Sequence, residues 1–154
     1  MQYSIDFVLN QIIKPSLIFL DMASADLETF LASAACCQHP VNGGYGVYQI
    51  SHLQHWNLWD HYLVHHPLLA SKVRGLASQH RFLEDPDLEL TMNPGYAAAI
   101  AALLMFQQLG KRPEDTLTFE QMYRAWRIIA PQTPRRALKK RCLQADALQM
   151  HRVA

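Results

Sequence analysis

The chain has 154 residues, of which 50% are hydrophobic and 18% are charged, and its formal net charge is +1. This length and composition predict one compact domain over residues 1–154 and argue against intrinsic disorder. Because the net charge is small, we expect no nucleic-acid partner. The first residues lack a basic stretch followed by an apolar run, and the longest apolar stretch, 96–106, is shorter than the ~20 residues of a membrane span. We therefore expect neither a signal peptide nor a membrane span.

Apolar periodicity and capping residues predict a mainly α fold. The predicted helices, in chain order, are residues 4–13, ended by Pro15, a short turn or helix at 16–22, a helix capped by Ser24 that runs to Cys37, then 52–65, 68–82, 94–109, 118–129 and a basic C-terminal helix at 135–151. The small residues at 32–35 would let another helix approach closely, so we expect the 24–37 helix at the centre. Residues 39–44 should form a loop, and 45–51 a short hairpin or extended segment.

The cysteines number three, and two of them, Cys36 and Cys37, are adjacent; the third is Cys142. Neighbouring cysteines rarely pair, because the bridge strains the peptide between them. An odd, unpaired set of this kind predicts reduced thiols and a protein made in a cytoplasm.

Two segments resemble a known family of glycan-cleaving proteins. Residues 31–38 read Leu-Ala-Ser-Ala-Ala-Cys-Cys-Gln, and residues 42–51 read Asn-Gly-Gly-Tyr-Gly-Val-Tyr-Gln-Ile-Ser. They resemble the central helix and the Gly-Leu-Met-Gln or Gly-Leu-Phe-Gln signature of lysozyme-like lytic transglycosylases (the SLT type), and most closely a bacteriophage family of that superfamily. The similarity extends from about Ile13 to Thr133, and it includes Lys14 and Pro15, residues 58–63, Asn93 with residues 96–101, and Trp126 with Arg127. It implies a lysozyme-like single domain with a short β or extended element beside a cleft.

The acids of that family are missing. A glycosidase needs a carboxylic acid to protonate the leaving oxygen, and by the resemblance the catalytic glutamate falls on Cys37 and a second acid on Ser51. The loop before the Gly-rich segment is also shorter than in the family. In the family a Tyr-Asn-Thr follows the Trp-Lys, and of these three residues this chain keeps only the threonine, Thr133. The resemblance thus implies a degenerate phage protein, made in the host cytoplasm and incorporated in a virion. We expect a structural or adaptor role in the tail or another particle component, beside other virion proteins, without glycosidase activity.

Two other functions stay open. The first is an active peptidoglycan-cleaving enzyme with Glu28 as displaced acid, although Glu28 lies nine residues before Cys37 and so projects from nearly the opposite side of the helix. Cys37 could also be a nucleophile with His39 as base, but a buried cysteine usually packs as a small apolar side chain. The second is a non-catalytic peptidoglycan-binding module.

The sequence also offers candidate binding residues. Aromatic rings can stack on sugars, and the candidate glycan contacts are Tyr45, Tyr48, Gln49, Trp56 and Trp59. Aromatic residues at helical spacing are more often part of the core.

The basic face of the last helix is the candidate partner surface, through Arg135, Arg136, Lys139 and Lys140, with an apolar stripe beside it that must pack on something. His61 and His65 have the spacing of two zinc ligands but lack the accompanying glutamate. We expect no metal and no cofactor.

Overall fold

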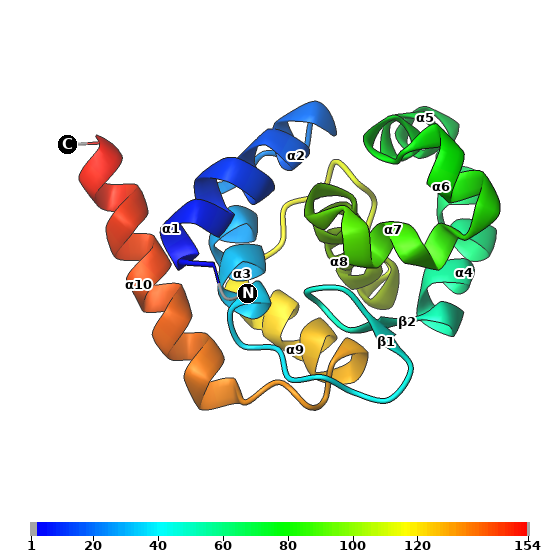
Figure 1. The fold of residues 1–154 in the computed structure, drawn as a ribbon. Helices are drawn as coiled ribbons and strands as arrows, with labels where there is room; N and C mark the ends of the chain where they lie inside the picture. The colour runs from blue at the N-terminus through cyan, green and yellow to red at the C-terminus, as the bar shows by residue number, and fades with distance from the viewer. Residues whose placement is uncertain (1–2, 154) are drawn as a thin grey trace.

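The computed structural model describes residues 3–153 and is mainly helical, as the sequence predicts. Its elements are α1 (Ile5–Phe7), a π-helical segment (Val8–Ile13), α2 (Lys14–Phe19), α3 (Ala25–Ala35), β1 (Gly44–Tyr45), β2 (Ile50–Ser51), α4 (His52–His61), a 3₁₀ turn (Leu63–His65), α5 (Pro67–Leu76), α6 (Gln79–Glu84), α7 (Pro86–Met92), α8 (Pro94–Leu109), α9 (Phe119–Ile129) and α10 (Arg135–Val153). Helix α8 runs through the middle, with α1 to α3, α9 and α10 on one side and α4 to α7 on the other (Figure 1). None of the helices in residues 3–153 is long and apolar enough to cross a membrane.

The N-terminal helix continues through Pro15, where the sequence predicts its end. The segment before it, Val8–Ile13, is π-helical, and the Lys14 N–H bonds to the Leu9 carbonyl five residues back. Pro15 then sits in the first turn of α2, where a missing N–H costs little. The change of hydrogen-bond register therefore lets the helix pass the proline and reach Phe19.

Helix α3 is buried, as the small residues predict, but α8 and not α3 lies at the centre of the molecule. Ser24 caps it by accepting a hydrogen bond from the Leu27 N–H, and every residue from Leu27 to Ala34 is buried. The helix ends at Ala35, two residues before the predicted end, and Cys36 follows as its C-terminal cap. Cys37 therefore lies in the turn that leaves the helix.

A two-stranded antiparallel hairpin follows, with Gly44 opposite Ser51 and Tyr45 opposite Ile50. Gly46 has a φ of +74°, and a Cβ built there would lie 1.9 Å from the Leu90 carbonyl oxygen of α7. The turn of the hairpin is thus seated directly on the backbone of α7, which only glycine permits.

Helices α4 to α7 form the second side of the molecule. Helix α4 begins with a capping box between Ser51 and Gln54. The single helix predicted at 68–82 is divided into α5 and α6, because Ala77 is extended and Ser78 caps a new helix by accepting from the Arg81 N–H.

Helix α8 agrees with the prediction at both ends. Asn93 caps it by accepting from the Tyr96 N–H, and Gly110 ends it in the left-handed conformation. All residues from Tyr96 to Phe106 are buried, so this helix forms the core between the two sides.

The last helix, α10, lies along α3 at the edge of the molecule (Figure 1). Its apolar stripe, Leu138, Cys142 and Ala145, is buried. The stripe therefore packs within this chain, and the exposed positions of α10 carry basic residues together with Leu143 and Met150.

Candidate functional site

A cavity of about 610 Å³ opens beside the end of α3. Its walls come from four segments: the N-terminal helix, the end of α3, the hairpin, and the junction of α7 with α8. Lining side chains include Ile12, Cys36, Gln38, Gln49 and Thr91. This is the place where the sequence predicts a cleft, and no carboxylate is among the described residues that line it.

The two cysteines at the end of α3 are not suited to acid or nucleophilic chemistry. Cys36 lines the cavity, whereas Cys37, the predicted position of the acid, is buried outside the cavity lining. Burial raises the pKa of Cys36, and it raises the pKa of Cys37 to about 11. Both thiols are therefore protonated at neutral pH. His39 is exposed and, within the residues that the structure describes, forms no hydrogen bond to either of them.

The other predicted acid positions serve the fold. The Ser51 hydroxyl accepts from the Gln54 N–H as the cap of α4. Glu28 is buried against Lys14, with Oε2 2.8 Å from Nζ, and Lys14 also donates to Gln149 of α10. Glu28 thus joins the N-terminal helix to α3, away from the cavity.

The predicted glycan contacts are divided between two places. Tyr48 is 1% exposed, its hydroxyl donates to the Leu31 carbonyl, and its ring packs edge-on against Trp126. Gln49 accepts from the Val41 N–H and donates to the Gly46 carbonyl. These side chains hold the hairpin in shape, and Tyr45 is half-buried on the first strand.

Trp56 and Trp59 instead line a separate cavity of about 220 Å³ between α4 and α6. The other residues of its lining are His55, Asp60, Phe82 and Pro86. We name these six residues the aromatic pocket. It lies outside the cavity at the end of α3, so the structure does not combine the five candidates into one sugar-binding surface.

A buried chain of hydrogen bonds lies behind the aromatic pocket. Asp87 contacts Nδ1 of His52 and, at 2.9 Å, Nδ1 of His55. Nε2 of His55 is 2.7 Å from the Tyr96 hydroxyl, which also accepts from the Trp59 indole at 3.0 Å. Burial lowers the pKa of His55, against the opposing effect of Asp87.

This network has one consistent proton assignment. Neutral His55 donates from Nδ1 to Asp87 and accepts at Nε2 from Tyr96. Sequence analysis missed the network, because its members are 32 and 41 residues apart and Asp87 stands in a segment that looks like a helix breaker.

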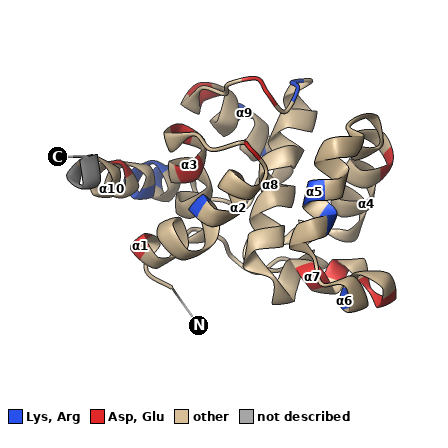
Figure 2. Ribbon diagram, turned by 90° about the horizontal axis from the view of Figure 1, so that it is seen from above, with Lys and Arg blue, Asp and Glu red and all other residues tan. Residues whose placement is uncertain are grey.

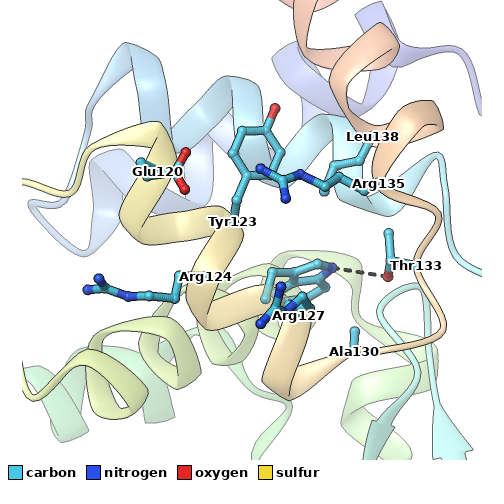
Figure 3. A pocket seen from close by; sticks show the side chains of 9 residues that line it. Glu120, Tyr123, Arg124, Arg127, Ala130, Thr133, Arg135 and Leu138 are labelled. Carbon is cyan, nitrogen blue, oxygen red and sulfur yellow. Dashed lines mark hydrogen bonds between the residues drawn. The ribbon is translucent and has the colours of Figure 1, made fainter.

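Arg135, the first residue of α10, borders a third cavity of about 220 Å³ between α9 and α10 (Figure 3), whereas Arg136, Lys139 and Lys140 are not part of its lining. Arg135 reaches from α10 toward Tyr123 of α9, Arg127 projects from α9, and Trp126 donates to Thr133 on its floor. Arg135, Arg136, Lys139 and Lys140 are all exposed. None of these four has an ion pair among the residues that the structure describes.

His61 and His65 are both exposed. Within residues 3–153, no group of three or more His, Cys, Asp or Glu side chains is arranged to hold a metal ion.

Comparisons with protein-family models, with curated proteins and with solved structures gave no match.

Proposed function

We propose that this chain is a non-catalytic, lysozyme-like protein of a bacteriophage particle, with a structural or adaptor role. The observation that carries the proposal is the cavity between the end of α3 and the hairpin, whose described lining offers no carboxylate. Loss of general acid catalysis alone costs ~10²–10⁴ in rate. The half-buried thiol of Cys36 and the buried thiol of Cys37 supply no substitute, because their pKa values are raised.

The basic face of α10 supports a role in assembly. Its four cationic residues are exposed, whereas the apolar stripe of the same helix is buried where α10 packs on α3. Figure 2 shows basic residues gathered on α10, together with an acidic position of the same helix, whereas most acidic residues lie on other elements. Such a face attracts an acidic surface and fixes its orientation more than it adds apolar burial.

Charge reversal tests the assembly role. In the variant Arg135→Glu with Lys139→Glu, we expect at least about tenfold less chain in particles purified on a density gradient from the native lysate. The matched control is Lys111→Glu with Arg112→Glu, which changes the net charge equally in the loop after α8. Normal incorporation of the first variant, or wild-type chain found only as a free monomer, would contradict the proposal.

Enzymatic inactivity is tested separately on peptidoglycan. We expect the purified chain to release no muropeptides above a heat-treated sample. Release that Glu28→Gln abolishes would show an active enzyme with a displaced acid and would overturn the non-catalytic role.

A further inference from the structure

The aromatic pocket has the composition of a site for an organic cation. Trp56 is 45% exposed, Trp59 and Phe82 are half-buried, and the Trp59 and Phe82 rings meet edge to face at 65° with centroids 5.6 Å apart. Two nearly perpendicular aromatic walls form a corner, and the indole of Trp56 belongs to the same lining. The faces of such rings carry negative potential and attract cations, with tryptophan the strongest.

The walls are held in place by the buried hydrogen-bond network. Trp59 is fixed through its indole N–H to Tyr96, and His55 is fixed at both ring nitrogens. His55 and Tyr96 are each at most 1% exposed. Because these rings are ordered before any ligand arrives, binding loses little side-chain entropy.

The same hydrogen bonds decide what kind of ligand fits. The polar atoms of His55 and the indole N–H of Trp59 are already engaged, so only Trp56 and the Asp60 carboxylate remain to contact a polar ligand. A sugar would need several partners for its hydroxyl groups. A quaternary or alkylated ammonium group needs none, since it binds through charge and surface contact.

The charges around the pocket also favour a cation. Asp60 is exposed and belongs to the pocket lining, it forms no ion pair within the described part of the chain, and no lysine or arginine belongs to the lining. Asp87 lies behind His55. Arg74 opposes this, because its guanidinium rests 4.0 Å from the Phe82 centroid. That contact also shows that the Phe82 ring of the aromatic pocket can bind a cation, here the guanidinium of Arg74.

We propose that the aromatic pocket binds an alkylammonium group, such as a quaternary ammonium headgroup or an alkylated lysine side chain. The residues of this site belong neither to the basic face of α10 nor to the lining of the cavity at the end of α3.

The test compares choline with its neutral carbon isostere, in which a tert-butyl group replaces the trimethylammonium group. Both are titrated into the full chain, and binding is followed by tryptophan fluorescence and by the indole N–H signals in NMR. We expect saturable choline binding that is at least about tenfold tighter than binding of the isostere, because the two differ only in charge.

Variants then locate the site. Trp56→Ala and Asp60→Asn should weaken choline binding, and Trp56→Phe should retain most of it. Leu53→Ala changes an exposed residue of the same helix outside the pocket and should leave binding unchanged. Circular dichroism and the thermal midpoint confirm that each variant is folded.

Three results would overturn the proposal. Equal affinity for choline and the isostere would mark an ordinary apolar pocket. Saturable binding of N-acetylglucosamine that Trp56→Ala removes would show a sugar site instead. No saturable binding of choline would mark Trp56, Trp59 and Phe82 as packing residues alone.

Discussion

Glycines at the hairpin show how one residue decides a contact between elements. Gly43 and Gly46 both have positive φ, yet a Cβ at Gly43 would meet nothing within 4 Å, whereas one at Gly46 would collide with the Leu90 carbonyl. A side chain at Gly43 would therefore cause backbone strain alone, whereas a side chain at Gly46 would cause the same strain and also a steric clash.

Replacing each glycine with alanine measures the two effects. Gly43→Ala should cost about 1 kcal/mol of unfolding free energy, from the left-handed backbone alone. Gly46→Ala carries the same strain and also displaces the hairpin from α7, so we expect more than about 3 kcal/mol. Urea denaturation provides both values, and equal losses would show that the hairpin does not rest on α7.

At the scale of elements, local signals predicted helices well where their ends carry strong caps. The start of α3 was predicted from Ser24. The start and the end of α8 were predicted from Asn93 and Gly110. Pro15 misled the prediction, because a π-helical segment that no local pattern announces carries the helix past it.

Substitutions on the two faces of α10 show which face of this helix stabilises the fold. Leu138 is 3% exposed against the body of the protein, and Leu143, on the same helix, is 71% exposed. Leu138→Ala should lower the free energy of unfolding by about 2–4 kcal/mol through cavity formation. Leu143→Ala should change it by less than about 0.5 kcal/mol. Similar losses in a denaturation series would contradict the packing of α10 on α3.

For the whole molecule, the sequence predicted the mainly helical class and a short extended element after the helix that Ser24 caps. It did not predict the network of His55, Asp87 and Tyr96. Buried polar groups pair across long sequence distances, and periodicity registers only which positions are buried.

That network makes the stability of the fold depend on pH. Burial lowers the pKa of His55 below 6.5 in the folded chain, so the unfolded chain binds the proton first as the pH falls. The free energy of unfolding should therefore decrease from neutral pH toward about pH 5.5, with the loss complete below the folded pKa.

Denaturation at about pH 7.5 and about pH 5.5 checks the sign. His55→Gln can still donate to Asp87 and accept from Tyr96, so it should remove much of the pH dependence. His80→Gln, at a site whose side chain is 93% exposed, should preserve it. An unchanged slope in His55→Gln would assign the effect to other groups.

The seat of Gly46 on Leu90 has a consequence for communication within the protein. Helix α7 carries the Leu90 carbonyl that Gly46 rests on and, three residues earlier, Asp87, the anchor of the histidine network. Helix α7 therefore lines both cavities, through Thr91 in one and Pro86 in the other, and a ligand that displaces this helix in one cavity would also alter the other. Such coupling is reciprocal by linkage. A ligand bound in either cavity would therefore change the affinity of the other cavity for its own ligand.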